Sequence, residues 1–586
     1  MEKEQNNIEI RRHSLAHILA AAVGELYPKV KFGMGPATDK GFYYDFDFGE
    51  ENIGEEDLKK IEKKMKHLIK QNLKFKKSEL DISEALSREK GGGQNYKAEL
   101  VEELKKEGEK KANYHQLGEF KDLCKGPHVN STKELNPKAF KLTSLAGAYW
   151  KGNENNNMLT RIYGVAFDTP QELEEYLRLV EETKKRDHRK LGRELDLFCF
   201  SDLVGPGLPM FTPKGTIIIN ELRKKVEEIC SGYGFENVIT PHLAKIDLYQ
   251  LSGHADKFAD ELFHVTSKHK QDYVMKPVQC PHQTQIYASR PRSYRDLPIR
   301  YMESEKQYRA EKPGEIGGLT RVIAITVEDG HSFCRVEQVK QEVKNMVEII
   351  KNFYTSLGLW ENHWVSLSVR DYEHPEKYIG DPGDWDTCEK MLGEICEDMN
   401  LEAKRCEGEA ALYGPKIDFM FKDALGKEIQ IPTVQLDFAT PKKFNLVFTN
   451  EKGEEENPVM VHRAILGSYE RFLSLLIEHF AGAFPVWLSP VQVKILSVGE
   501  AHHDYCQKLA QELRQHQLRV ETDTDSDTIN YKIRKATGEK VPYVLVIGDK
   551  EVESDKLSIR DRGQAKTREV DKKEFIKEIK KEINNF

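Results

Sequence analysis

The sequence lacks the features that mark membrane, disulfide-stapled and repeat proteins. No apolar run in its 586 residues approaches the roughly 18 that a membrane-spanning helix needs. The apolar stretch 15–26 contains His17 and Glu25 and follows a segment of mixed charge, which is unlike a secretory signal. Nine cysteines are scattered without a Cys-x-x-Cys pair, and no fixed-period repeat is visible. We therefore expect a cytoplasmic protein with no membrane role, whose cysteines are thiols or metal ligands.

A surplus of positive charge is also missing, because the formal net charge is −8. This total does not indicate nucleic acid binding, although a large protein can carry a local basic patch. The length exceeds what one hydrophobic core serves, so we expect about three or four domains of roughly 100–200 residues. The Lys-rich segment 58–77 has apolar residues at helical spacing, which predicts a helix with a solvated outer face rather than an RNA patch.

Changes in pattern divide the first third of the chain into two parts. Residues 1–168 combine a helical stretch at 10–26 with an aromatic, strand-like segment at 41–46, which predicts an α+β domain. Residues 169–194 predict a single charged helix that links domains, with Thr169 as its N-cap.

Two further domains are expected after this linker. Residues 195–485 alternate helices with strand-like runs such as 365–369 and 416–421, as a large antiparallel-sheet domain requires. Residues 486–586 contain apolar strands, one of them at 543–547, alternating with helices, which predicts a small α/β domain with a mainly parallel core.

The first group of residues with a chemical signature surrounds a Gly- and Pro-rich loop after residue 311. Arg309 and Glu311 precede this loop, and Arg321 follows it. Two strands joined by such a loop would fix guanidinium groups where a triphosphate could lie, since Arg is a permanently charged, bidentate donor. Ordinary surface salt bridges are the alternative. Later in the chain, Gly467 would let a flat base approach the backbone, and Arg471 would stack on that base.

These segments together resemble motifs 2 and 3 of class II aminoacyl-tRNA synthetases, and Pro241, after the run 236–240, resembles the motif 1 proline of their dimer interface. Within the class, the sequences around Cys280, His331 and His462 resemble the threonyl-tRNA synthetase family, where these positions supply zinc ligands. One thiolate and two imidazoles leave an open position on zinc, as in catalytic sites. Taken singly, each is an ordinary buried thiol or histidine, and spacing does not show that they meet.

The resemblance implies an enzyme that uses ATP with magnesium to activate L-threonine and then transfers it to tRNA(Thr). Valine is nearly isosteric with threonine, and an apolar pocket rejects an isostere only about 100-fold. Zinc can instead bind the amino and hydroxyl groups of threonine together. The implied threonine-binding residues are Asp329, which would accept from the hydroxyl, Tyr413 and Thr433. The implied ATP-binding residues are Arg309 at the α-phosphate, Glu311 at adenine, Arg321 and Arg471 at the triphosphate, Gln430 and Ser468. Lys416 joins the three arginines as a catalytic candidate.

A second group of residues lies in the N-terminal part. Two histidines one helical turn apart are followed by a Cys-x-x-x-His pair. Spacing alone permits a complete zinc site or, for the first pair, an ordinary helix with two polar histidines. The surrounding segments resemble the editing domain of bacterial threonyl- and alanyl-tRNA synthetases, which in the threonyl branch implies hydrolysis of seryl-tRNA(Thr) without a metal. Editing is expected because serine has the same amino and hydroxyl groups as threonine and lacks only one methyl group. The loss of that methyl group provides only about 1–3 kcal/mol of discrimination. The candidate editing residues are His13, His17, Lys97, Asp122, Cys124 and His128.

The tail resembles the anticodon-binding domain shared by threonyl, prolyl, histidyl and glycyl enzymes. The resemblance implies that Glu553, Arg560 and Arg562 meet anticodon bases; a charged hairpin at 548–553 is the alternative. Taken together, the resemblance to the threonyl-tRNA synthetase family covers nearly the whole chain and implies a homodimer. It also implies that the small N-terminal domain of many bacterial members is missing, since His13 already lies at the start.

Several pocket positions depart from the family pattern. Val327 matters most, because the usual glutamine would touch the reacting carboxyl or phosphoryl group, and losing one such donor commonly costs about 100- to 1000-fold. Three interpretations therefore remain. The chain is a working ligase with an inhibitor-tolerant pocket, a paralogue with little ligase activity that serves as a tRNA-binding or regulatory protein, or a trans-editing hydrolase with a vestigial catalytic domain. A prolyl enzyme shares the class and the tail but does not need the Cys/His trio. The other departures are Val278 and Gln279 for Met-Asn, Ile323 for arginine, and Ile431 and Pro432 for Cys-Gly.

Overall fold

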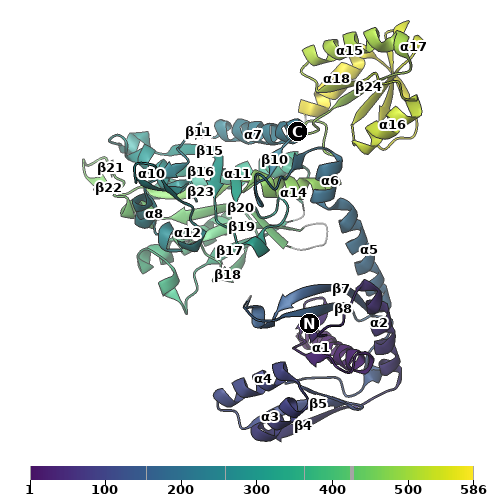
Figure 1. The fold of residues 1–586 in the computed structure, drawn as a ribbon. Coiled ribbons are helices and arrows are strands. Elements are labelled where there is room, and N and C mark those ends of the chain that lie inside the picture. Colours follow the sequence, from purple (N-terminus) through teal and green to yellow (C-terminus); the bar gives the residue numbers. More distant parts are fainter. Residues whose placement is uncertain (1, 154, 258, 362, 423–427, 585–586) are drawn as a thin grey trace. The chain divides into compact units, whose positions relative to one another are not determined.

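The computed structural model describes residues 2–153, 155–257, 259–361, 363–422 and 428–584 (Figure 1). The chain divides into two compact units, 1–181 and 182–586. Within the described ranges, no helix has the length and apolar character needed to cross a membrane.

The first unit has α+β architecture, as predicted. Helix α1 packs on the main sheet, where Phe42, Tyr44 and Phe46 alternate inward and share a core cluster with the apolar face of α1. The sheet has strand order β1-β3-β8-β7, with β2 also paired to β3, and a second sheet has the order β4-β5-β6. The main elements are α1 (Glu2–Leu26), β1 (Lys31–Phe32), β2 (Ala37–Thr38), β3 (Gly41–Asp47), α2 (Glu55–Lys70), β4 (Phe75–Asp81), α3 (Ile82–Gly91), α4 (Asn95–Lys106), β5 (Lys111–Leu117), β6 (Phe120–Leu123), β7 (Phe140–Tyr149) and β8 (Met158–Ala166).

Two predictions about helix boundaries are wrong. The Lys-rich helix does not extend to residue 77: it ends at Lys70, and Asn72 adopts a left-handed conformation (φ 54°) before the chain continues as β4. The linker is two helices, α5 (Pro170–Arg186) and α6 (His188–Glu194), because Asp187 leaves helical geometry and caps α6 by accepting from the Arg189 amide at 2.8 Å.

The predicted cap at the start of α5 is confirmed. The Thr169 hydroxyl accepts from the Glu172 amide at 3.2 Å, and the Glu172 carboxylate accepts in return from the Thr169 amide at 3.1 Å. Each side chain therefore satisfies a backbone donor that has no partner inside the helix.

The second unit contains an eight-stranded sheet in the order β11-β15-β16-β23-β20-β19-β17-β18, which confirms the predicted antiparallel core. Only the outer pairs β11/β15 and β17/β18 are parallel in the described sheet. The strands are β11 (Glu236–Asn237), β15 (Ile299–Tyr308), β16 (Ala324–Cys334), β17 (His363–Val369), β18 (Lys404–Glu407), β19 (Lys416–Lys422), β20 (Glu428–Asp437) and β23 (Val459–Ala464).

Helices cover both faces of this sheet. Helices α7 (Pro213–Gly232), α11 (Val339–Ser356) and α14 (Tyr469–Phe480) contribute to the largest core cluster. Helix α10 (Cys280–Ala288) contributes to a separate cluster with Phe333 of β16 and Met460 of β23. Since side chains alternate along a strand, His331 and His462 share the α10 side of the sheet with those two residues.

The C-terminal part is the predicted α/β domain. Strands β25, β24 and β26 are parallel, as expected, whereas β27 and β28 extend the sheet in antiparallel fashion. The elements are β24 (Val493–Ser497), α15 (His503–Gln515), β25 (Val520–Asp523), α16 (Ile529–Gly538), β26 (Tyr543–Ile547), α17 (Asp549–Val552), β27 (Lys556–Asp561), β28 (Arg568–Asp571) and α18 (Lys572–Asn584).

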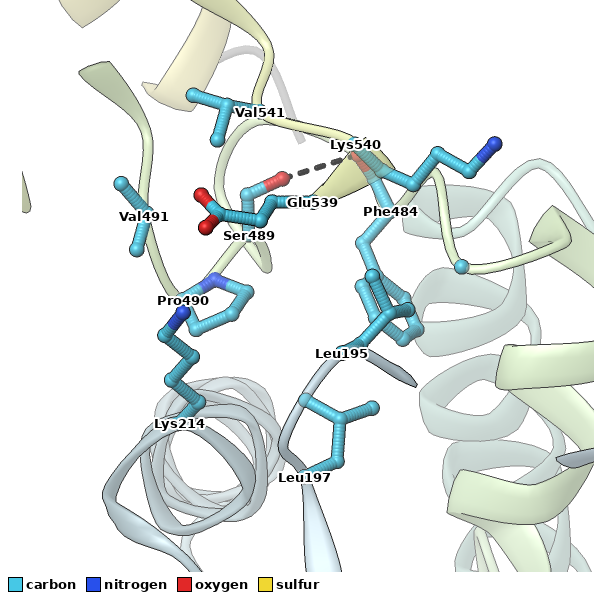
Figure 2. Close-up of a pocket in the computed structure, with 11 residues that line it drawn as sticks. Leu195, Leu197, Lys214, Phe484, Ser489, Pro490, Val491, Glu539, Lys540 and Val541 are labelled. Carbon is cyan, nitrogen blue, oxygen red and sulfur yellow. Dashed lines mark hydrogen bonds between the residues drawn. The ribbon is translucent and has the colours of Figure 1, made fainter. Parts of the chain in front are cut away.

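A small pocket within the second unit is lined both by residues that precede the eight-stranded sheet in the chain and by residues of the C-terminal domain. Figure 2 shows Leu195 and Leu197 from the core and Pro490 and Val541 from the later chain among its lining residues. The nearby Arg562 guanidinium donates to the carbonyl oxygens of Phe484, at 2.8 Å, and Lys540, at 2.9 Å. These bonds fasten the connecting segment to the C-terminal sheet.

Candidate functional site

The three predicted metal ligands meet in the second unit. Cys280 begins α10, and His331 and His462 are direct cross-strand partners in β16 and β23. One ligand atom from each lies within 4.8 Å of the others, and all three side chains are buried. The β16–β23 register therefore brings together residues that lie far apart in sequence.

Hydrogen bonds orient both imidazoles. Nδ1 of His331 lies 2.8 Å from Oε1 of Gln283, and Nε2 of His462 lies 3.0 Å from Oδ2 of Asp437. Nε2 of His331 is buried and has no hydrogen-bond partner among the described residues. A buried nitrogen without a hydrogen bond, beside a thiol and a second imidazole, fits a zinc ion. Burial lowers the pKa of His331, which keeps the ring neutral as a metal ligand must be.

A cavity of about 190 Å³ opens beside this trio. It is lined by Asp329, Tyr413 and Thr433, as well as by Cys280 and His462. The Tyr413 ring stacks on the His462 ring at 4.6 Å, and burial raises the pKa of Asp329 to about 8. The cavity is of the size of a small amino acid, and a buried metal site would form one wall.

The sequence analysis assigned no role to several residues that line the same cavity, among them His254 and Gln307. Neither residue lies in a recognisable sequence motif, so no signal in the sequence pointed to them. His254 is buried in the structure. The Tyr413 hydroxyl also donates to Gln435 at 2.6 Å, so this glutamine fixes the phenol ring at the cavity wall.

A larger cavity of about 650 Å³ lies beside the first. Arg309, Glu311, Arg321, Ser468 and Arg471 all line it, and Arg309 lines the smaller cavity as well. The Arg321 guanidinium forms an ion pair with Glu311 at 2.6 Å. Ser468 caps α14 by accepting from the Arg471 amide at 3.3 Å. The shared Arg309 is placed to contact groups in both cavities.

Three predicted residues lie outside both of these linings in the described structure: His331, which is buried behind the smaller cavity, Lys416 and Gln430. Lys416 pairs with one oxygen of Asp418 at 2.9 Å, and Gln430 donates to the other oxygen at 2.6 Å. Asp418 is therefore a buried anchor that the sequence analysis missed, and it holds Lys416 and Gln430 on neighbouring strands.

Three of the six departures from the family pattern line the cavities. Val278 and Val327 line the smaller cavity and Ile431 the larger one. The buried Gln279 amide donates at 3.3 Å to the carbonyl oxygen of Val327 and at 3.3 Å to that of Glu305. The backbone amide of Ile323 donates to the Gly207 carbonyl at 2.8 Å, and Pro432 is buried.

The first unit brings the predicted editing residues together. Sγ of Cys124 lies 3.2 Å from Nε2 of His13 and 3.2 Å from Nε2 of His128, and these three residues form a second group that could hold a metal. His17 is buried one turn along α1, with its ring 5.0 Å from that of His128. Burial lowers the pKa of His17 to about 4 and raises that of Cys124 to about 11, so both are neutral near pH 7.

A buried ion pair supports this cluster. Lys97 of α4 lies 2.7 Å from Asp122 of β6, which also accepts from the Tyr44 hydroxyl at 2.6 Å. The sequence analysis missed His115, whose ring centroid is 4.6 Å from that of His128 and whose Nδ1 is 3.1 Å from the Cys124 carbonyl oxygen. Its cross-strand position opposite Asp122 follows from the hairpin register, which the sequence did not reveal.

The predicted anticodon residues have different surroundings. Glu553 is exposed directly after α17, and Arg560 is half-buried on β27. The segment 549–552 forms this short helix rather than the hairpin that was the alternative. Arg562 is engaged by the two carbonyl oxygens at the domain junction described above.

Comparisons with known proteins agree with this architecture. Residues 263–480 match the tRNA synthetase class II core domain (G, H, P, S and T), residues 492–582 match the anticodon binding domain, and residues 114–163 match the threonyl and alanyl tRNA synthetase second additional domain.

Two curated relatives cover almost the whole chain. A threonine–tRNA ligase from Oceanobacillus iheyensis is 43% identical over 584 residues, which is 100% of this chain and 90% of the relative. A threonine–tRNA ligase from Gloeobacter violaceus is 46% identical over 559 residues, which is 94% of this chain and 88% of the relative. Among solved structures, the RNA binding domain of threonyl-tRNA synthetase from Cryptosporidium parvum Iowa II aligns with a TM-score of 0.64 and 33% identity, over 67% of this chain and 98% of that one.

Proposed function

Because the chain belongs to the threonine–tRNA ligase family, we propose that it activates L-threonine as threonyl-adenylate beside a zinc ion and then transfers threonine to tRNA(Thr). As a class II synthetase it uses ATP with magnesium. The observation that carries the finer proposal is the pair of adjoining cavities that share Arg309, the smaller of which is lined by Cys280 and His462 of the Cys/His trio.

Cys280, His331 and His462 would hold the zinc ion, which supplies coordination for the amino and hydroxyl groups of threonine. Asp329 would accept a hydrogen bond from that hydroxyl, and Tyr413 and Thr433 would enclose the side chain. The isosteric valine cannot make the hydroxyl contact, so its rejection does not depend on size alone.

The larger cavity would hold ATP. Arg309 would contact the α-phosphate as the threonine carboxylate attacks it, while Arg321 and Arg471 would hold the triphosphate and Glu311 the adenine. Fixed guanidinium groups would act here by electrostatic stabilisation and positioning, and magnesium bound with ATP would supply positive charge to the pyrophosphate. Glu311 now pairs with Arg321, so nucleotide binding would exchange that contact for one with the base. The remaining proposed contacts are those of Ser468 and Gln430 with ATP and of Lys416 with the reacting groups; Lys416 and Gln430 would exchange their contacts with Asp418 for these.

ATP–pyrophosphate exchange by the purified protein tests this proposal. We expect exchange with threonine, slower exchange with serine, and little with valine. The result that overturns it is the absence of threonine-dependent exchange, which would favour the weakened paralogue because Val278 and Val327 replace polar or flexible groups at the cavity. Seryl-tRNA hydrolysis without exchange would favour a trans-editing hydrolase.

We also propose that the first unit hydrolyses seryl-tRNA(Thr). The cluster has neutral histidines around a neutral thiol, and a neutral imidazole can take a proton from an attacking water. A groove of about 490 Å³ leads to Cys124 and would admit the aminoacyl end. The proposed residues are His13, His17, Lys97, Asp122, Cys124 and His128. Hydrolysis that survives removal of all metal supports this mechanism, and hydrolysis that requires zinc favours the complete zinc site.

The proposed organisation has four parts: an editing domain at 1–168, a helical linker at 169–194, a catalytic domain at 195–485 and an anticodon-binding domain at 486–586. Glu553 and Arg560, with Arg562 at the domain junction, would contact the anticodon. We propose a cytoplasmic homodimer that pairs through the segment around Pro241, where the neighbouring Ile239 is 85% exposed. Light scattering at a known concentration tests the dimer, and a monomeric mass would contradict it.

A further inference from the structure

Two side chains outside the metal trio lie within hydrogen-bond distance of its two histidines. Gln283 lies behind His331, and Asp437 lies behind His462. All four side chains are buried, so water is a poor substitute for either hydrogen bond. Histidines that bind metals usually donate their other ring N–H to such a partner, which fixes both the ring orientation and the tautomer.

Asp437 is held rigidly by the backbone. Its Oδ1 accepts from the amides of Ala439 and Thr440, each at 2.8 Å, at the start of α13 (Ala439–Lys443). Its Oδ2 is thereby directed at Nε2 of His462, 3.0 Å away. A carboxylate can only accept, so Nε2 carries the proton and Nδ1 of His462 keeps its lone pair.

Gln283 acts on the other histidine. Its Oε1 accepts from Nδ1 of His331, and its Nε2 has no hydrogen-bond partner among the described residues. With the proton on Nδ1, Nε2 of His331 keeps its lone pair, and this is the buried nitrogen that has no hydrogen-bond partner in the described structure.

We propose that Asp437 and Gln283 are the positioning residues of the metal site, and that they act by fixing complementary tautomers: Nδ1 of His462 and Nε2 of His331 are the nitrogens presented to zinc. This inference rests on the proposed zinc site. Neither residue contacts threonine or ATP in this scheme. Asp437 also differs from an ordinary packing residue, because its effect depends on a lone pair rather than on shape.

Asp437→Asn separates the tautomer effect from the structural one. The asparagine oxygen can keep both backbone hydrogen bonds, but its amide nitrogen then faces His462 and can only donate. Nε2 of His462 must accept, so the proton moves to Nδ1 and the metal loses a ligand. We expect zinc affinity to fall by about 10- to 100-fold, the usual effect of removing such a partner.

Gln283 offers a matched pair of variants. Gln283→Glu keeps an acceptor at Nδ1 of His331, so zinc affinity should be retained. Gln283→Leu removes the acceptor and should weaken zinc binding by about 10- to 100-fold. If the amide nitrogen of Gln283 instead donated to His331, the glutamate variant would be the weaker binder.

The experiment measures zinc affinity of the full chain by competition with a chromogenic chelator, and thermal unfolding of each metal-stripped variant. The proposal expects weak binding in Asp437→Asn and Gln283→Leu, near-normal binding in Gln283→Glu, and an unchanged unfolding temperature for stripped Asp437→Asn. Normal zinc affinity in Asp437→Asn overturns it. If stripped Asp437→Asn is less stable than stripped wild type, the Gln283 pair decides, and equal affinities of its two variants overturn the proposal. Failure of the wild-type protein to bind zinc would instead refute the proposed metal site itself.

Discussion

Replacing Gly330 by alanine tests how rigidly the strand between Asp329 and His331 is held. A methyl group at this position would lie 2.2 Å from Nη2 and 2.8 Å from Cζ of Arg463, the cross-strand partner of Gly330. The Arg463 guanidinium is fully buried and is clamped by Glu328 at 2.7 Å. It therefore cannot swing away without breaking a buried ion pair.

The expected cost follows from these contacts. Overpacking a core costs about 1–3 kcal/mol, and separating a buried ion pair costs about 3–5 kcal/mol because one charge is left unpaired. Displacement of Arg463 would leave Glu328 alone in the core, so we expect a loss of about 3–5 kcal/mol. Local opening of β16 and β23 should then increase roughly 100- to 4000-fold, since each 1.4 kcal/mol is a factor of ten.

Hydrogen–deuterium exchange of peptides from β16 and β23 measures this opening. The matched control is Gly232→Ala, at the end of α7, where a methyl group would meet no described atom within 4 Å. Because alanine is favoured in helices by about 0.5–1 kcal/mol, the control should not increase exchange. In a background that combines Arg463→Met with Glu328→Gln, the Gly330→Ala cost should largely disappear. Exchange within a factor of two or so of wild type would show that the guanidinium is free to move, and the reasoning would be refuted.

Three further predictions concern the two sites. Cys280→Ser should lose bound zinc in metal analysis, and discrimination against valine should fall toward the roughly 100-fold that an apolar pocket provides; zinc retained at wild-type stoichiometry would contradict the ligand set. Lys97→Met should leave Asp122 buried without its cation, slow seryl-tRNA(Thr) hydrolysis and destabilise the first unit by about 3–5 kcal/mol, while threonine-dependent exchange stays unchanged; equal loss of both activities would argue against separate sites. Burial lowers the pKa of His17 to about 4 in the native state, against 6.5 in the unfolded chain. The neutral His17 therefore contributes about 3 kcal/mol to the free energy of unfolding above pH 6.5, and this contribution is lost as pH falls toward 4. Denaturation of the first unit against pH should show this loss in wild type but not in His17→Gln, and parallel curves for the two proteins would refute the assignment.

Much of the architecture could be predicted because local patterns carry it. The aromatic, strand-like segment 41–46 and the helical stretch 10–26 are properties of short segments, and both elements form, although α1 already begins at Glu2. The Lys-rich prediction was wrong because helical spacing ran past Lys70, whereas Asn72 supplies a left-handed residue that ends the helix. Similarly, Asp187 was treated as a charged helical residue, although its side chain competes for the backbone and caps a new helix.

The sequence by itself determined the kinds of chemistry present: a thiol and two imidazoles in one region, a histidine and cysteine set in another, and arginines beside a Gly- and Pro-rich loop. Only the tertiary structure decided which of these meet, because a cross-strand register joins His331 to His462 and no local interaction specifies it. The same holds for Asp437, Gln283 and His115, whose roles depend on one hydrogen bond or ring contact made across the fold. Residue type fixes which bonds a side chain can make, whereas long-range packing chooses its partner.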